Sequence, residues 1–105
     1  MRPIAGVELK QLKKNTDERG YLCELLRKDW SIFKEFTMAY FSMTFPGVVR
    51  GWHRHPRTKQ FDCICILQGS AKIVVYDDRE DSPTKGFINE FIVSEDNPTL
   101  LKIPG

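Results

Sequence analysis

Histidine and cysteine are both scarce in this chain, which has two histidines and three cysteines among its 105 residues. An odd number of cysteines does not fit a disulfide framework, and Cys63 and Cys65, two residues apart on a strand, would form a strained bridge. The C-x-C spacing also differs from that of zinc knuckles. We therefore expect reduced thiols in a cytoplasmic protein, with Cys23, Cys63 and Cys65 serving as small apolar packing residues.

Long apolar runs and clusters of like charge are also missing from the sequence. No run is long enough to span a membrane, and the opening residues MRPIAGVELK lack the apolar core of a signal peptide. Sixteen lysines and arginines stand against 14 acids, for a net charge of +2, and the two signs alternate along the chain. We expect a cytoplasmic protein that binds neither membranes nor nucleic acids. With no linker or repeat, residues 1–105 are predicted to form one domain.

The chain does contain many short segments rich in β-branched and aromatic residues, each bounded by Gly, Pro, Asp or Asn. These segments predict strands at 7–12, 21–27, 36–44, 48–53, 61–67, 71–77, 87–93 and 99–103. One short helical turn is expected across 28–34, where Asp29 is placed to cap it. So many short strands with regular turn signals predict an all-β fold, an antiparallel β-sandwich of the jelly-roll type.

The two histidines lie two residues apart, at the end of the predicted strand 48–53. Side chains on a strand repeat with period 2, so His53 and His55 are expected to project to the same face. Imidazole titrates near neutral pH and carries a lone pair when neutral, which suits both metal ligation and proton transfer. The alternative is two exposed histidines at a strand end.

Asp62 lies at the start of the next predicted strand, on the same face as Ile64 and Ile66. Both faces of strand 61–67 are largely apolar, so we expect it to be central and covered on both sides. An ionised carboxylate there needs a partner or an opening to water. Asp62 therefore either reaches solvent at the strand end or lines a cavity, where it would orient a histidine or share a metal with the pair.

A series of motifs runs in order through most of the chain. They are Asp17-x-Arg19-Gly20 followed by Glu24, Gly47-Val48-x-Arg50-Gly51-x-His53, Gln60, Gly69, Asp77-x-Arg79, Ser82-Pro83-Thr84-x-Gly86 and the closing Leu101-x-Ile103-Pro104. In order and spacing the series resembles the dTDP-4-dehydrorhamnose 3,5-epimerases. The resemblance implies a cupin jelly roll that needs no metal or cofactor and acts on nucleotide-linked 4-keto-6-deoxy sugars. It also implies homodimers in which N-terminal strands cross between subunits.

The resemblance also implies roles for individual residues. It makes His53 the base that removes a proton next to the sugar ketone, a step for which imidazole is well suited. It places Arg19 and Glu24 against the nucleotide, with Gln60 also in the substrate site, and Arg50 near the diphosphate and sugar. An arginine fork matches phosphate oxygens, which supports Arg19 and Arg50 as diphosphate anchors.

The chain departs from the family pattern at several positions. Asp62 stands where the family has a lysine that steadies the enolate, so Lys59 or Arg50 would have to supply that positive charge. Met38 and Tyr40 occupy the positions of the family's base-contacting residues. After Gly105 the family continues into a second histidine motif, a tyrosine acid and an aspartate. We expect either an incompletely represented chain or a reduced homologue.

Three alternatives stay open. Gly51-x-His53-x-His55 followed by Gln60 is similar to the signature of the sugar-nucleotide 3,4-ketoisomerases, for which two bases on one face are useful. His53, His55 and Asp62 also form a possible ligand set for iron, manganese or zinc in a metal-dependent cupin. The third alternative is a non-catalytic cupin that binds a sugar nucleotide.

Overall fold

The computed structural model describes residues 2–36, 38–54 and 61–105, and every regular element in these ranges is a strand. The strands are β1 (Glu8–Gln11), β2 (Lys14–Asp17), β3 (Gly20–Cys23), β4 (Asp62–Ile64), β5 (Ser70–Tyr76), β6 (Ile88–Ser94) and β7 (Thr99–Ile103). All of their pairings are antiparallel. The predicted all-β, antiparallel fold is therefore confirmed.

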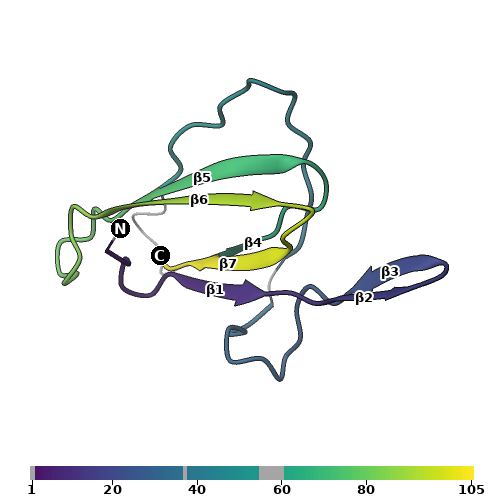
Figure 1. Cartoon of the computed structure of the whole chain (residues 1–105). Helices are drawn as coiled ribbons and strands as arrows, with labels where there is room; N and C mark the ends of the chain where they lie inside the picture. Colours follow the sequence, from purple (N-terminus) through teal and green to yellow (C-terminus); the bar gives the residue numbers. More distant parts are fainter. Residues whose placement is uncertain (1, 37, 55–60) are drawn as a thin grey trace.

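The strands form two facing layers and a projecting hairpin. A three-stranded sheet in the order β1-β7-β4 lies beneath the β5-β6 hairpin, while the β2-β3 hairpin extends away from both layers (Figure 1). β7 is the middle strand of its sheet, and Thr99, Leu100, Leu101 and Lys102 are all buried. Side chains that alternate along a strand point to opposite faces, so both faces of β7 are covered.

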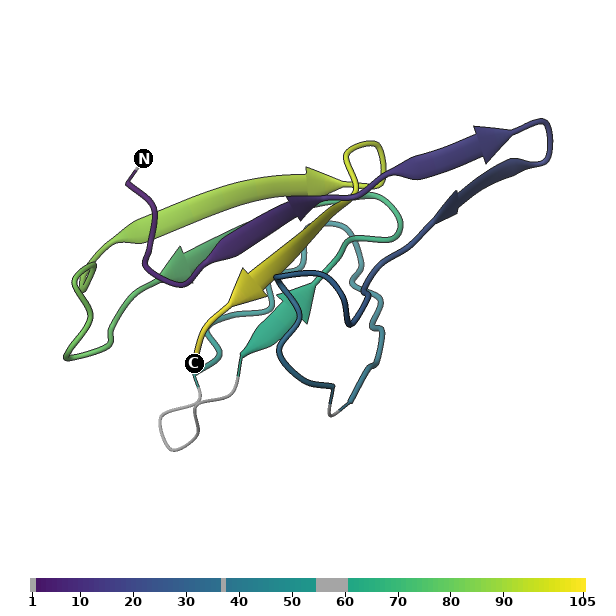
Figure 2. The same ribbon diagram turned by 90° about the horizontal axis from the view of Figure 1, so that it is seen from below.

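The core is therefore split between the two faces of the three-stranded sheet. On one face Leu101 has no exposed surface, and it lies on the side of the β5-β6 layer, which contributes the buried Val75 and Val93. On the other face Leu100 packs with Leu12 and Ile32. Viewed from below, the segment that follows β3 crosses this second face (Figure 2). The partly buried residues that pack against that cluster are Cys23, Trp30 and Cys65.

The cysteines only partly follow the prediction. Cys23 and Cys65 pack against the core, as expected of small apolar residues. Cys63 is exposed. Its register partner on β7 is Lys102, and the two side chains share one face of the sheet. The packing prediction is therefore wrong for Cys63.

Several strand predictions hold closely. Strand 99–103 is found with the predicted bounds, and 7–12, 71–77 and 87–93 are each found to within one residue at either end. Predicted strand 21–27 is shorter, because only Gly20–Cys23 pairs, and its partner β2 is a polar segment that was not predicted. Gly20 adopts a φ of 132°, a conformation that side-chain-bearing residues rarely adopt, and this allows the tight connection between β2 and β3.

The prediction of strands at 36–44 and 48–53 is wrong. Residue 36 and residues 38–54 are described, and none of them belongs to a strand. Alternating apolar residues favour an extended chain, but a strand also needs a neighbour with which to exchange hydrogen bonds. Strand 61–67 is likewise reduced to β4, which pairs only with β7 and lies at the edge of its sheet among the described strands. The expected central position is therefore also wrong.

Residues 28–32 form turns in place of the helical turn expected across 28–34. The backbone NH of Trp30 donates to the carbonyl of Arg27 at 3.2 Å, and that of Phe33 donates to the carbonyl of Trp30 at 3.0 Å. Asp29 accepts from the guanidinium of Arg27 at 2.9 and 3.0 Å, so its side chain is engaged there and caps no helix. The part of the chain that the structure describes contains no helix of the length and apolar character needed to cross a membrane.

Candidate functional site

The densest group of polar side chains lies at the end of β5 and in the loop that leads to β6. The carboxylate of Asp77 has no exposed surface. It accepts hydrogen bonds from Arg79 Nε at 2.9 Å and Arg79 Nη2 at 3.0 Å, from Ser82 Oγ at 2.6 Å and from Thr84 Oγ1 at 2.5 Å. The Arg79 guanidinium, followed by the two hydroxyls, holds the pKa of Asp77 far below its usual range.

This group, which we call the Asp77 clamp (Asp77, Arg79, Ser82 and Thr84), forms hydrogen bonds to the backbone of the N-terminal segment at Ala5. Arg79 Nη2 donates to the carbonyl of Ala5 at 2.8 Å, and Thr84 Oγ1 accepts from the Ala5 NH at 3.0 Å. The motifs Asp77-x-Arg79 and Ser82-Pro83-Thr84 therefore have a structural role that the sequence did not reveal. The available signal was an acid, an arginine and two hydroxyl residues gathered around one predicted turn.

The buried Asn89 on β6 forms hydrogen bonds to the same N-terminal segment. It is 1% exposed, accepts from the Ile4 NH at 2.9 Å and donates to the carbonyl of Arg2 at 2.7 Å. Both ends of its amide are used, which is what a polar side chain at this depth requires.

His53 lies in an exposed segment, residues 38–54. Its imidazole is exposed and has no hydrogen-bond or ion-pair partner within the residues that the structure describes. The next residue, Arg54, forms an ion pair with Asp78 at 3.0 Å. Because His53 is not on a strand, the reason given for placing it on the same face as His55 is not confirmed. His55 and Gln60 lie outside the described residues.

Arg50 and Tyr40 belong to the same exposed segment. Arg50 Nε donates to Thr44 Oγ1 at 2.7 Å and Arg50 Nη2 to the carbonyl of Met43 at 2.8 Å, so Arg50 ties together the loop between them. Tyr40 is 80% exposed. Within the described residues neither side chain forms a hydrogen bond or ion pair with His53, so the structure brings these predicted substrate residues onto one segment without joining them directly.

Asp62 faces the space between the two layers. It is half-buried, and its register partner on β7 is Ile103, on the same face as Leu101 and Ile64. Lys102 projects to the opposite face, so this lysine does not replace the one that the family pattern has at position 62. In the described ranges no group of three His, Cys, Asp or Glu residues is placed to hold a metal.

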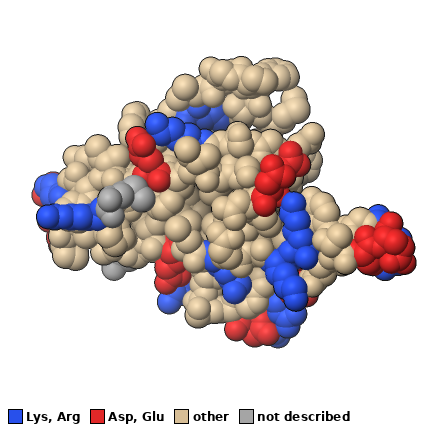
Figure 3. Space-filling model, viewed as in Figure 1, with Lys and Arg blue, Asp and Glu red and all other residues tan. Residues whose placement is uncertain are grey.

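Arg19 and Glu24 lie toward the projecting hairpin. Arg19 is at the β2-β3 connection, where its guanidinium bonds Asp17 at 2.7 Å and lowers the pKa of that carboxyl. Glu24 follows β3 and forms an ion pair with Arg27 at 3.2 Å. Charged side chains gather at the far end of the hairpin (Figure 3). Within one chain the structure does not bring either residue to His53.

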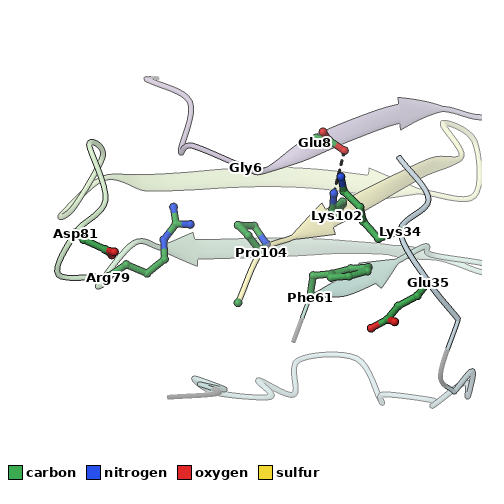
Figure 4. Close-up of a pocket in the computed structure, with 10 residues that line it drawn as sticks. Gly6, Glu8, Lys34, Glu35, Phe61, Arg79, Asp81, Lys102 and Pro104 are labelled. Atoms are coloured by element: carbon green, nitrogen blue, oxygen red, sulfur yellow. Dashed lines mark hydrogen bonds and ion pairs between the residues drawn. The ribbon is translucent and has the colours of Figure 1, made fainter. Parts of the chain in front are cut away.

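Two cavities lie near the elements described above. The larger, of about 640 Å³, is lined by the cations Lys34, Arg79 and Lys102, by the acids Glu8, Glu35 and Asp81, and by Gly6, Phe61, Pro104 and Gly105 (Figure 4). Its three cations balance its three acids, so it carries no net charge to select an anion. Among the predicted site residues, Glu24 lines the smaller of these two cavities, of about 190 Å³, beside Trp30.

The profile of the dTDP-4-dehydrorhamnose 3,5-epimerase family matches residues 1–105. The chain belongs to this family. The resemblance drawn from the motifs is thereby confirmed, and the chain is placed among the sugar-nucleotide epimerases and isomerases, which are enzymes.

Two curated relatives of this epimerase-family chain act in polysaccharide or glycan synthesis according to their names. A probable low-salt glycan biosynthesis epimerase of Haloferax volcanii is 44% identical over 106 residues, which cover 100% of this chain and 67% of the relative. The spore coat polysaccharide biosynthesis protein SpsL of Bacillus subtilis (strain 168) is 44% identical over 101 residues, which cover 96% of this chain and 66% of the relative.

A solved structure supports the same placement. The crystal structure of a dTDP sugar isomerase from Desulfovibrio desulfuricans G20 superposes with a TM-score of 0.89 at 33% identity, covering 96% of this chain and 64% of that one. The fold of this epimerase-family chain is thus the predicted cupin type. The chain spans about two thirds of the length of the proteins that it matches.

Proposed function

We propose that the protein is a 3,5-epimerase of nucleotide-linked 4-keto-6-deoxy sugars, with His53 as its base. The observation that carries the proposal is the position of His53 in Arg50-Gly51-Trp52-His53, within a family match over residues 1–105, with an exposed imidazole that no described residue engages. A base needs one ring nitrogen with a lone pair within reach of substrate, and an exposed imidazole meets that requirement.

The chemistry follows from the acidity of a carbon next to a ketone. A ring nitrogen of His53 takes the proton, the C–H bond breaks, and its electron pair moves toward the ketone oxygen to give an enolate. Return of a proton to the opposite face of that carbon inverts it. The enolate oxygen needs a positive group or a hydrogen-bond donor, and we assign this role to Arg50, three residues before His53 in the same motif. Asp62 has the wrong charge for this role, and we place it among the groups that orient substrate or base.

The proposal includes a homodimer that completes the site. Arg19 and Glu24 lie on or beside a hairpin that projects from the body, so they would contact the nucleotide in a partner's site (Figure 1). Residue 36 and residues 38–52 also expose many large apolar side chains, which a second copy would cover. These are Phe36, Met38, Tyr40, Phe41, Met43, Phe45, Val48, Val49 and Trp52. Light scattering that shows a monomer at micromolar concentration would contradict this part of the proposal.

The location and the organisation of the chain are also part of the proposal. The three cysteines are free thiols, which is the usual state in the cytoplasm, and we place the enzyme there. We treat residues 1–105 as belonging to a single cupin-like domain. A dTDP-linked sugar of a rhamnose-type route is the proposed substrate, in line with the family description.

The test is to incubate the full-length protein with dTDP-4-keto-6-deoxyglucose in deuterated water. Incorporation of deuterium into the sugar is then followed by mass spectrometry and NMR. A 3,5-epimerase exchanges the protons at C3 and C5, whereas a 3,4-ketoisomerase exchanges the C3 proton and moves the carbonyl. His53→Ala should abolish exchange. The matched variant His55→Ala should only slow it in an epimerase but stop it in a two-base ketoisomerase. Absence of exchange in the wild type, with tightly bound metal lost in both variants, would replace the proposal with a metal-dependent cupin.

A further inference from the structure

The segment that carries His53 is joined to the sheets by few polar contacts. Within segment 38–54 the hydrogen bonds of Arg50 go to Met43 and Thr44, and the NH of Val48 bonds the carbonyl of Phe45. All of these contacts are internal to the segment. Among the described residues, the Arg54–Asp78 ion pair, with Nε and Oδ2 3.0 Å apart, is the one hydrogen bond or ion pair that joins the segment to the rest of the chain.

Asp78 directly follows Asp77, whose side chain and backbone are both held by hydrogen bonds. The preceding residue, Asp77, has its carboxylate fixed by the Asp77 clamp. Its backbone is fixed as well, since its NH donates to the carbonyl of Phe87 at 3.0 Å and its carbonyl accepts from the NH of Gly86 at 2.7 Å. The ion pair therefore connects the residue next to His53 to one of the most constrained points in the fold.

We propose that Arg54 and Asp78 are positioning residues. Their ion pair holds the backbone at His53 in a fixed position relative to the sandwich. This inference rests on the proposed function of His53. A catalytic base must be held within a fraction of an ångström of its working position, and this segment has no strand partner among the described residues to hold it there. Neither Arg54 nor Asp78 is required to touch the substrate.

The size of the effect follows from the exposure of the pair. The Arg54 side chain is 68% exposed and that of Asp78 is 45% exposed, so the pair is worth no more than a typical surface ion pair and is screened by salt. Arg54→Ala and Asp78→Asn should each lower kcat by about two- to fivefold at low ionic strength and leave KM unchanged. The difference from wild type should shrink at high salt.

Rescue distinguishes positioning from general damage. Arg54→Lys retains the charge and should recover part of the lost kcat. The charge swap of Arg54→Asp with Asp78→Arg should be more active than either single substitution. The matched control is Glu80→Gln, which breaks an exposed ion pair with Lys85 (2.6 Å) in the same loop without touching segment 38–54. It should leave kcat and KM at wild-type values.

A second measurement is independent of activity. Amide hydrogen exchange in a peptide covering residues 48–54 should be about two- to fivefold faster in Asp78→Asn, and unchanged in Glu80→Gln. If the wild type is active and kcat is unchanged in Arg54→Ala and Asp78→Asn, the inference is overturned, whether or not amide exchange in residues 48–54 becomes faster. A wild type without sugar deuteration overturns the proposed function, and unchanged peptide exchange would then remove the fastening role as well.

Discussion

Substitution of Asp77 by Asn tests the most strongly bonded feature of the fold. The replacement has nearly the same shape but removes the negative charge, and it turns one acceptor oxygen into an NH₂ donor. That donor would face groups that are themselves donors, namely the guanidinium of Arg79 and the hydroxyls of Ser82 and Thr84. We therefore expect the Asp77 clamp to open and its hold on Ala5 to weaken.

The expected magnitude follows from burial. Removing one partner of a buried ion pair costs about 3–5 kcal/mol, because it leaves the other charge uncompensated. Asp77 is fully buried, but the Arg79 side chain is 31% exposed and can recover some hydration, so the low end applies. We expect a loss of about 3 kcal/mol in the free energy of unfolding. For a domain of this size that lowers the unfolding midpoint by about 12 to 24 °C.

The assay is thermal and urea unfolding followed by circular dichroism. The control is Asp17→Asn, which removes the acid of an exposed ion pair with Arg19 and should leave the midpoint at the wild-type value. The double variant Asp77→Asn with Arg79→Met should lose less than the sum of the single losses, because the two residues share one interaction. A loss below about 1 kcal/mol in Asp77→Asn, or strict additivity with Arg79→Met, would refute the reasoning.

Three further predictions concern acid stability, the core and the exposed segment. Because the folded pKa of Asp77 is lowered, the stabilisation is complete above the ordinary carboxyl value of 3.8 and is lost as the pH falls below it. A pH series of unfolding free energies should show this fall in the wild type, and a much smaller one in Asp77→Asn. Ile32→Ala, at a site 4% exposed, should cost about 2–5 kcal/mol in urea unfolding, whereas Ile92→Ala, at a site 77% exposed, should cost little. Phe41→Ser should weaken self-association measured by light scattering, because the ring is 88% exposed within one chain and lies on the proposed dimer surface. Unchanged association would contradict that surface.

The candidate site was only partly predictable from the sequence. The spacing of Arg50 and His53 in a family motif predicted a base and a diphosphate anchor without any structure, because motif spacing is a property of the chain itself. The strand predicted to carry them is not formed, since local alternation favours an extended backbone but does not provide a partner. For the same reason Asp62 was placed on a central strand, whereas the structure puts it on an edge strand facing the space between the layers.

The sequence by itself determined the class of fold, because period-2 alternation and turn residues act over a few neighbouring positions. Strand 99–103, which carries Leu100 on one face and Leu101 and Ile103 on the other, was located from its residues alone and became the central strand of its sheet. Only the tertiary structure decided what the polar motifs do. Arg79 bonds the carbonyl of Ala5 74 residues away, and Asn89 bonds that of Arg2 87 residues away. Such partners are chosen by how the sheets stack, and no local pattern encodes a contact over that separation.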